Sequence, residues 1–383
     1  MNNNNRCLGF SVRGVCLEHS PKYVISKEQL LFDLYKAFYD ARKGKSKKSY
    51  VKEFEKNLHQ NLSALRDEIY YRTYSPRLLT CFVISYPKKR EIFASEFVDR
   101  IVHHLYFNYL HEYFERTFIY DCYSCIKGRG TSFGIERLQH HIRSASNNYT
   151  KECYVLKLDI SSYFMSINRK LLLDIVLKNL DNFEKKCNTL DFELLRYLSK
   201  EIILHDPTEN CIRKATSKDY IGMPLGKRMS KAKEGYGLPI GNLTSQLFSN
   251  VFLNLLDQYI KRELKFKHYG RYVDDLFIVS TDKAKLLSCI PQIETFLNTV
   301  LDLKLNNGKT KLNKIRYGVE FLGGYVKPHG VYVSNQCLRR MKTKMKENLH
   351  TKAKDKIIAS NISQLGLLKQ FKAYNIAKKL FYG

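Results

Sequence analysis

The sequence predicts an α+β fold in which helices are combined with antiparallel hairpins. Two patterns and the composition predict this class. Residues 27–73 repeat apolar side chains at helical spacing, whereas residues 78–94 and 266–280 each contain two short runs of aromatic and branched residues around a polar turn. Hydrophobic residues make up 44% of the chain, which favours a folded protein over a disordered one. A length of 383 residues suits two or three subdomains.

The chain carries a large excess of positive charge. There are 65 Lys and Arg against 37 Asp and Glu, a formal net charge of +28. Because cations that contact phosphates release counterions and dominate nucleic-acid affinity, this excess predicts a polyanionic partner. No stretch reaches the roughly 18 apolar residues that span a membrane, so we expect a cytoplasmic protein with no membrane partner. Ten cysteines lack a repeated ligand spacing, which predicts reduced thiols and no zinc site.

The N-terminal part is predicted to be helical and then to form a basic hairpin. Helical spacing over residues 27–73 is interrupted by a basic linker at residues 42–48. Strands are predicted at residues 78–86 and 91–94. The turn between them carries three consecutive cations, Lys88, Lys89 and Arg90. Such a tip can bind a triphosphate or a template backbone, although a solubilising turn has the same composition.

A helix is predicted over residues 95–117, with His103 and His104 adjacent on it. Neighbours on a helix point about 100° apart, so we interpret the pair as packing or phosphate contacts and not as a metal site. The loop that follows contains Lys127 and Arg129 beside glycines. Small residues let a backbone approach phosphates closely, but a flexible loop has the same composition.

Asp159 ends a buried-strand pattern at residues 154–159 and precedes a polar turn into a helix. Further helices lead to a polar, lysine-rich loop at residues 205–236. The turn at residues 237–246 has glycines that allow close backbone approach. It is expected to line a base-pair pocket at the start of a helix over residues 247–264.

The C-terminal part is predicted to contain an amphipathic helix, a basic loop and a second hairpin, at residues 283–301, 306–311 and 321–334. From Lys327 to the end, thirteen Lys or Arg stand against two acids, in segments with helical spacing. We therefore expect this tail to face nucleic acid.

Asp274 and Asp275 lie side by side between two apolar runs, at the expected turn of a hairpin. Adjacent carboxylates raise each other's pKa, so such a pair persists mainly where a cation compensates it. An acidic surface turn is the alternative if the pair stands alone. If Asp159 converges with the pair, beside the Ile160 carbonyl, the set could hold two Mg²⁺ ions about 3.5–4 Å apart. This arrangement predicts metal-dependent nucleotidyl transfer.

The ordered motifs resemble those of reverse transcriptases of the group II intron-like, bacterial type, over residues 75–335. The motifs that carry the resemblance are the Asp159 strand, the turn at residues 237–246, the acidic hairpin from Tyr272 to Asp275, Lys309-Thr310 and the hairpin from Phe321 to Tyr325. The loop at residues 127–131 and the run at residues 99–104 are similar to the same family.

The turn also resembles that of reverse transcriptases from diversity-generating retroelements. Most reverse transcriptases carry Gln before the second glycine and end the turn in Ser-Pro, whereas this chain has Ile240 and Ser245-Gln246. The resemblance implies copying of a template-repeat RNA into cDNA with errors at template adenines, which diversifies a target gene. Gln could hydrogen-bond near the incoming nucleotide, whereas Ile240 can only pack, so discrimination would relax.

The resemblance implies a right-hand polymerase with helical and hairpin fingers, an antiparallel-sheet palm and a short helical thumb. The implied parts are an N-terminal helical extension, fingers, a palm that includes the loop at 205–236, and a short basic helical thumb, at residues 1–74, 75–152, 153–334 and 335–383.

Residue roles are also implied by the resemblance. The implied catalytic residues are Asp159, Asp274, Asp275 and Lys309. The implied metal ligands are Asp159, Ile160, Asp274 and Asp275. Nucleotide contacts are implied for Lys88, Lys89, Arg90, Phe164, Ile240, Gly241 and Gln246, and template or primer contacts for Lys127, Arg129, Tyr272, Gly323 and Gly324. Phe164 matches an aromatic gate that would collide with a 2′-hydroxyl, with a core role as the alternative. Lys309 would protonate the leaving pyrophosphate, with Lys311 as the alternative.

The resemblance further implies two Mg²⁺ ions, for which Mn²⁺ could substitute. The implied partners are an RNA template, a DNA primer or cDNA, dNTPs and a small basic oligomeric accessory protein. The alternatives are an antiviral or CRISPR-associated bacterial reverse transcriptase, a group II intron-derived enzyme, and an RNA-binding scaffold on an inactive polymerase fold. About fifty residues follow Ser334, which is short for an intron maturase thumb, and the tail's two acids could not build a ribonuclease H centre.

Overall fold

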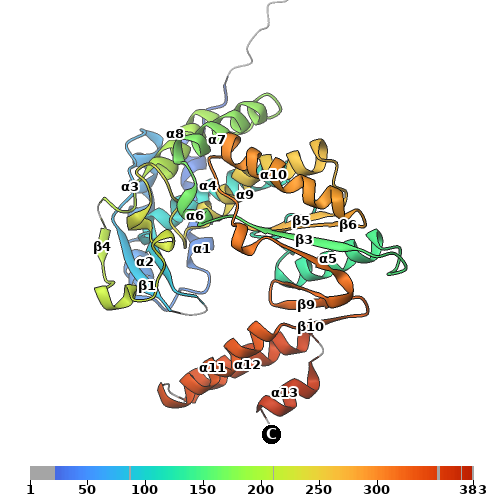
Figure 1. Ribbon diagram of the computed structural model, residues 1–383. Coiled ribbons are helices and arrows are strands. Elements are labelled where there is room, and N and C mark those ends of the chain that lie inside the picture. The colour runs from blue at the N-terminus through green and yellow to red at the C-terminus, as the bar shows by residue number, and fades with distance from the viewer. Residues whose placement is uncertain (1–21, 86–87, 210, 352–353, 372, 382–383) are drawn as a thin grey trace, which may run out of the picture.

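The computed structural model describes residues 22–85, 88–209, 211–351, 354–371 and 373–381. Helices surround small sheets whose strand pairs are antiparallel with one exception (Figure 1). The α+β class predicted from the sequence is confirmed. In the described part of the chain, no helix is long and apolar enough to cross a membrane.

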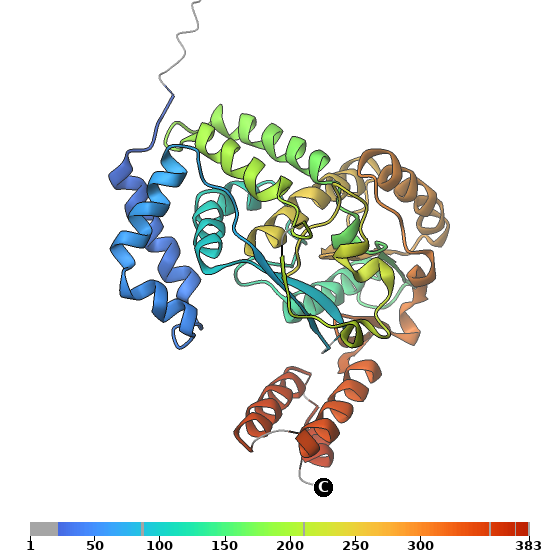
Figure 2. The same cartoon turned by 90° about the vertical axis from the view of Figure 1, so that its left-hand side faces the viewer.

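The first helices form a bundle, as the helical spacing predicted. The helices are α1 (Lys27–Arg42), α2 (Ser49–Lys56), α3 (Leu58–Tyr70) and α4 (Phe97–Glu115). The Ser26 hydroxyl accepts a hydrogen bond of 3.1 Å from the Gln29 backbone N–H and so caps the start of α1. Leu30, Leu34 and Phe38 are fully buried and form the face of α1 that packs on the bundle. Figure 2 shows α1 to α3 at one edge of the molecule.

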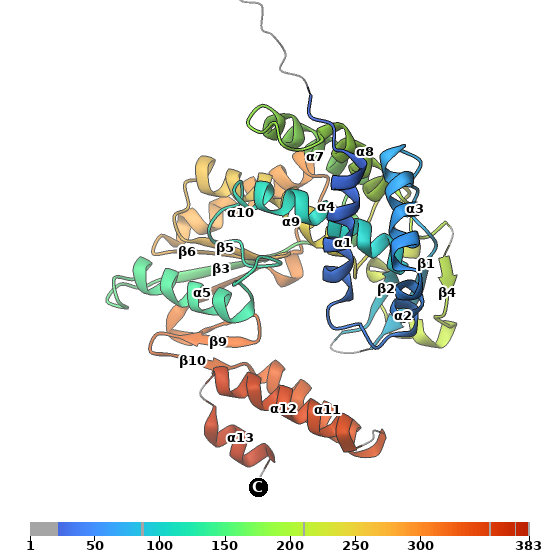
Figure 3. The same cartoon turned by 180° about the vertical axis from the view of Figure 1, so that it is seen from behind.

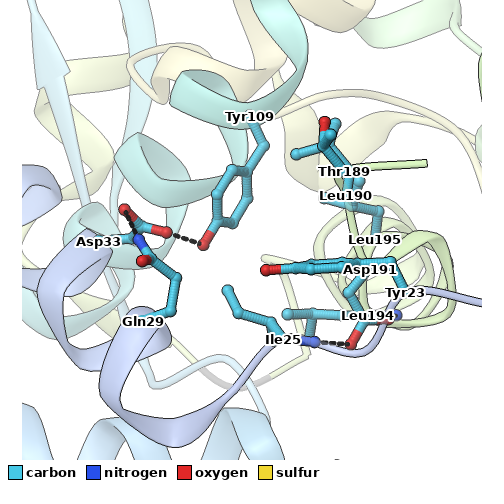
Figure 4. A pocket seen from close by; sticks show the side chains of 10 residues that line it. All are labelled: Tyr23, Ile25, Gln29, Asp33, Tyr109, Thr189, Leu190, Asp191, Leu194 and Leu195. Atoms are coloured by element: carbon cyan, nitrogen blue, oxygen red, sulfur yellow. Dashed lines mark hydrogen bonds between the residues drawn. The ribbon is translucent and has the colours of Figure 1, made fainter. Parts of the chain in front are cut away.

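A cavity of about 150 Å³ lies where α1 and α4 meet the start of α8 (Phe192–Leu204) (Figure 4). Tyr109 on α4 donates a hydrogen bond of 2.8 Å to Asp33, and the Ile25 N–H donates one of 3.3 Å to Asp191. These bonds attach the N-terminal helices to the rest of the chain. None of the residues that line the cavity is among the predicted site residues.

The predicted basic hairpin forms the strands β1 (Leu79–Ile84) and β2 (Arg90–Ala94). Its turn residue Pro87 lies outside the described residues. The loop predicted at 205–236 is more ordered than its polar composition indicated. It contributes β4 (Cys211–Arg213), which pairs in parallel with β1, and three short 3₁₀ turns. A three-residue strand is stable here because β1 supplies its hydrogen-bonding partner.

The central sheet has the strand order β5-β6-β3-β7 and is antiparallel throughout. Its strands are β5 (Tyr269–Tyr272), β6 (Asp275–Ser280), β3 (Tyr154–Asp159) and β7 (Lys311–Lys314). Side chains alternate between two cores, as the pleat requires. Val155 and Phe277 belong to the core beneath the sheet, whereas Leu156 and Ile278 belong to the core above it. Both faces are therefore buried, which holds the strand ends rigidly.

Helices cover both faces of the central sheet. α5 (Thr131–Ala145) lies between this sheet and β9, as Figures 1 and 3 show. The other face carries α9 (Leu243–Gln258) and α10 (Lys283–Val300), and α6 (Tyr163–Ser166) and α7 (Arg169–Glu184) follow β3. The helix predicted over residues 247–264 thus begins four residues earlier, and Gln246 lies in its first turn rather than in the preceding loop.

The C-terminal part consists of a small antiparallel sheet and three helices. The sheet contains β8 (Val319–Phe321), β9 (Gly324–Lys327) and β10 (Gly330–Val333). The helices are α11 (Asn335–Thr351), α12 (Lys354–Gln370) and α13 (Tyr374–Phe381). In Figure 1 they lie below the sheets, beside β10. The helices predicted for the basic tail are confirmed.

Candidate active site

The central sheet brings the predicted carboxylates together. Asp159 at the end of β3 is the register partner of Asp275 at the start of β6. Directly opposed residues of an antiparallel pair lie about 5 Å apart and present their side chains on the same face. Asp274 precedes Asp275 in the β5–β6 turn. Residues separated by more than a hundred positions in the sequence therefore form one acidic cluster.

The turn that carries Asp274 is held in an unusual backbone conformation. Val273 has a φ of 56°, in the left-handed region that β-branched residues rarely adopt. Two hydrogen bonds fix it: its N–H donates to the Ser124 hydroxyl at 3.2 Å, and its carbonyl accepts from the Arg271 guanidinium at 3.1 Å. Strain of this kind persists only where the surroundings enforce it. The position of Asp274 is therefore imposed by the fold.

Sequence reasoning missed the group that supports this turn. Arg271 and Asp257 are both fully buried and form an ion pair of 2.7 Å behind the acidic hairpin. The hydroxyl of Tyr269 also donates to Asp257 at 2.6 Å, and Arg271 donates to the Asn250 side chain at 3.1 Å. An arginine within a run that otherwise reads as a buried strand was the available signal, because a charge is buried only when it is paired.

The acidic cluster is electrostatically costly. Burial, together with the neighbouring Asp275 and Asp159, raises the pKa of Asp274 to about 6. Burial also raises the pKa of Asp275, although Lys157 on the adjacent strand opposes this effect. Carboxylates that repel one another in a buried place are stabilised by a bound cation.

Lys309 partly compensates this charge. Its ammonium group donates to both Asp159 oxygens, at 2.9 and 2.8 Å, and the Asn306 amide donates to Asp159 at 3.0 Å. Burial lowers the pKa of Lys309, but the bonds to Asp159 outweigh burial and raise it. Lys311 lies in β7 as the register partner of Lys157 and has an exposed side chain. Of the two candidate lysines, Lys309 is the one in contact with the cluster.

The residues present fit a hard divalent cation. Among the described residues, no three acidic, imidazole or thiol groups already converge closely enough to hold an ion by themselves. Mg²⁺, however, takes only one or two carboxylates and completes its shell with water and substrate phosphates. Asp159 and Asp275 lie near enough to raise the pKa of Asp274, and the three carboxylates together provide that donor set. Ile160, whose carbonyl is the fourth predicted ligand, forms an isolated bridge with Leu305 beside them.

Phe164 and Ile240 lie in one small apolar cluster. They pack on the buried Leu79, Phe93 and Met165. The Phe164 carbonyl accepts a hydrogen bond of 2.8 Å from the Leu238 N–H, so the segment after Asp159 and the glycine turn are directly joined. The turn predicted to line a base-pair pocket therefore lies next to the predicted gate.

The rest of the turn is fixed to the hairpin sheet. Gly241 has a φ of 122° and lies against β2, where an added Cβ would come within 3.4 Å of Ile92. The Asn242 side chain accepts a hydrogen bond of 2.9 Å from Ser95, and Thr244 bonds to His103 at 2.8 Å. Burial lowers the pKa of His103 to about 3, so this imidazole is a neutral packing group. Gln246 is exposed.

The three hairpin cations have different surroundings. Lys88 and Arg90 are exposed, whereas Lys89 donates a hydrogen bond of 2.8 Å to the Ile221 carbonyl. Although Lys88 is exposed, partial desolvation of its ammonium group lowers its pKa, the nearby cations Arg340 and Lys309 lower it further, and Asp275 of the acidic cluster raises it. Lys88 therefore lies within electrostatic reach of the acidic cluster, and Lys89 is engaged by the segment at 205–236.

Some of the predicted template and primer residues already form bonds or packing contacts within the protein. Lys127 is exposed, but Arg129 donates to the carbonyls of Tyr120 and Cys122, at 2.8 and 3.0 Å, and so stabilises its own loop. Tyr272 is half-buried in the core that contains α5. The glycine pair belongs to the tight β8–β9 turn, in which Gly323 has a φ of 87°. An added Cβ on Gly324 would come within 2.9 Å of Ile135.

Comparison with known proteins identifies the family. The model of the family "Reverse transcriptase (RNA-dependent DNA polymerase)" matches residues 87–326, well over half of the chain. The chain belongs to the reverse transcriptase family. The match includes the acidic cluster, the glycine turn and the β8–β9 hairpin, and it confirms the right-hand polymerase class predicted from the sequence.

Two known proteins are similar to this chain. Protein YkfC of Escherichia coli (strain K12) is 26% identical over 230 residues, which are 50% of this chain and 53% of that protein. The chain thus spans about half the length of this curated relative. A structure of telomerase from Candida albicans in complex with a fragment of telomeric RNA is similar with a TM-score of 0.45 and 13% identity, over 79% of this chain and 55% of that one.

Proposed function

We propose that this protein is an RNA-directed DNA polymerase whose active site is the cluster of Asp159, Asp274 and Asp275. The observation that carries the proposal is the register pair of Asp159 and Asp275 beside the strained turn of Asp274, within a reverse transcriptase domain. Asp159, Asp274 and Asp275, with the Ile160 carbonyl, would hold two Mg²⁺ ions. These ions would activate a 3′-hydroxyl and neutralise charge on the pyrophosphate.

The chain's own residues then have separate tasks. Lys309 donates two hydrogen bonds to Asp159, and from this position it would protonate the leaving pyrophosphate as a general acid. Lys88 and Arg90 are exposed cations on the hairpin that would bind the triphosphate. Residues 75–152 would act as fingers, 153–334 as palm and 335–383 as thumb, and the basic helices α11 to α13 would bind the template-primer duplex.

Primer extension tests the proposal. The purified protein should extend a DNA primer on an RNA template with dNTPs and Mg²⁺, and a chelator should stop the reaction. Failure to extend on several RNA templates, with Mn²⁺ as well as Mg²⁺ and with folding verified by circular dichroism, would contradict it.

Phe164 contacts the glycine turn at residues 237–246, which supports a role for its ring in excluding ribonucleotides. Replacing Phe164 with alanine should lower the ratio of kcat/KM for dGTP over GTP by about a hundredfold, because the collision with the 2′-hydroxyl is removed. Single-nucleotide insertion measures this ratio. Phe32, an exposed phenylalanine of α1, provides the control substitution. An unchanged ratio in an active Phe164→Ala variant would leave Phe164 as a core residue only.

Within the family, we propose the diversity-generating type, in which cDNA copied from a template-repeat RNA carries errors at template adenines. Ile240 supports it, because an apolar side chain occupies the turn beside Phe164 and offers no hydrogen bond to a base or sugar. A small basic accessory protein would be the partner in that process.

Restoring a polar side chain tests this subtype. Ile240→Gln should lower misincorporation opposite adenine by about tenfold and leave errors opposite the other three bases nearly unchanged, since one hydrogen bond contributes about 1 kcal/mol or more to discrimination. Sequencing of extension products measures the spectrum, with Ile212→Gln at an exposed isoleucine as the matched control. Equal wild-type error rates at all four template bases would rule the subtype out.

A further inference from the structure

Residues 211–236 lie between the hairpin sheet and the segment that follows Asp159. β4 adds a third strand to this sheet, and the Lys214 N–H extends the pairing with a hydrogen bond of 2.8 Å to the Cys81 carbonyl. The segment then returns toward the glycine turn, where the Gly237 N–H bonds to the Ile167 carbonyl at 2.8 Å. It is thus attached at one end to β1 and at the other to the palm.

A buried carboxylate anchors the middle of this segment. Glu91 on β2 is 1% exposed and accepts hydrogen bonds from the Met229 N–H and the Tyr220 hydroxyl, both at 2.5 Å. A buried carboxylate is tolerated only when such donors satisfy it. Since Glu91 directly follows Arg90 of the basic hairpin, the segment and the hairpin tip are fixed to each other.

Internal hydrogen bonds make the same stretch rigid. The Arg228 guanidinium donates to the carbonyls of Tyr220 and Met223, at 2.9 Å each. Lys89 donates to the neighbouring Ile221 carbonyl at 2.8 Å. Residues 220–228 therefore form an ordered loop that is held closed by hydrogen bonds.

At Gly226 this loop contacts the segment that follows Asp159. A Cβ added to Gly226 would lie 2.4 Å from the Ser162 hydroxyl oxygen, so the loop backbone packs directly against this side chain. Ser162 lies three residues after Asp159 and two before Phe164. The next loop residue, Lys227, is exposed.

Lys227 lies among cations that are only partly paired with carboxylates. Neither Lys227 nor Lys88 forms an ion pair with a carboxylate within the described residues. Partial desolvation of the ammonium group lowers the pKa of Lys88, and Arg340, Lys309 and Lys227 add to that effect, whereas Asp275 opposes it. These side chains are therefore within electrostatic reach of one another, and together they would attract an anion of several charges.

We infer that Lys227 binds the triphosphate of the incoming nucleotide together with Lys88, and that residues 220–228 form a fixed wall of the nucleotide pocket. The inference deepens the proposed polymerase function and rests on it. A phosphate of the template-primer backbone has the same chemistry. The contact of Gly226 with Ser162, between Asp159 and the gate residue, favours the nucleotide.

Steady-state kinetics separates the two sources of phosphate. Lys227→Ala should raise KM for dNTPs by about tenfold and change kcat less than threefold, because a charge-assisted hydrogen bond to the substrate is lost and the acidic cluster is untouched. The Kd for the template-primer duplex should stay constant. Lys227→Arg should recover most of the loss, and Lys218→Ala, at an exposed lysine of the same segment, should behave as wild type. An unchanged KM, or a raised duplex Kd with unchanged KM, would overturn the inference.

A binding measurement keeps this test independent of the proposed activity. Equilibrium binding of a fluorescent dNTP with Mg²⁺ is compared for wild type, Lys227→Ala and Lys218→Ala. About tenfold weaker binding by Lys227→Ala alone supports the inference, even if the wild type extends no primer. Equal affinities for all three proteins would overturn it, even if the wild type is an active polymerase.

Discussion

Asp274→Asn should lower primer extension by at least about 10³-fold. Asparagine keeps the shape of the side chain but not its charge, so the variant loses several kcal/mol of cation-mediated stabilisation of the transition state. Single-turnover extension on an RNA template measures the loss. Asp174→Asn, at an exposed aspartate of α7, is the matched control and should retain full activity.

The same substitution should not weaken the fold. Burial and two neighbouring carboxylates raise the pKa of Asp274, so ionising it costs the folded state free energy, and stability falls as pH rises from about 4 to about 6. At pH 7 in metal-free buffer, the neutral variant should melt at a higher temperature than wild type. Full extension by Asp274→Asn would refute the metal assignment, and a lower melting temperature would show that the cluster is not electrostatically strained.

Arg271→Met should destabilise the protein by about 3–5 kcal/mol. The substitution leaves the Asp257 carboxylate buried without its counter-ion, and an unpaired buried charge is among the most costly defects in a protein. It also removes the hydrogen bond to the Val273 carbonyl, so the turn that carries Asp274 loses one of its two restraints. Urea unfolding monitored by circular dichroism measures the free energy of unfolding.

Two further variants make this result interpretable. Arg316→Met, at an exposed arginine, should change stability by less than about 0.5 kcal/mol. Combining Arg271→Met with Asp257→Leu should cost less than the sum of the single changes, because no lone charge remains buried. Additive losses would mean that the two residues do not act as a pair.

Local patterns in the sequence predicted most of the elements. Helical spacing identified the helices of residues 27–73 and α10, and aromatic and branched runs identified the β1–β2 and β5–β6 hairpins. The start of α9 was misplaced by four residues, because Asn242 bonds to Ser95, a residue almost 150 positions away. β4 was missed because a three-residue strand depends on β1 for its hydrogen bonds. Both errors involve partners that are distant in the sequence.

The candidate site was likewise predicted from the sequence only in part. Acidic residues at two strand ends were visible in the sequence, since carboxylates in apolar runs are rare without a cation to compensate them. The roles of Arg271, Glu91 and Gly226 were not predicted, because each depends on a partner that is distant in the sequence. Arg129 was expected at the template but bonds to its own loop, which composition could not reveal.

The sequence by itself determined the chemistry of this protein: three aspartates in strand patterns, a basic chain and an apolar residue in the glycine turn. Only the tertiary structure decided that Asp159 opposes Asp275, that Lys309 contacts Asp159, and that Gly226 lies against Ser162. The reason is physical. Side-chain type and spacing are local properties of a chain, whereas strand register and burial are set by packing between segments that are far apart in sequence.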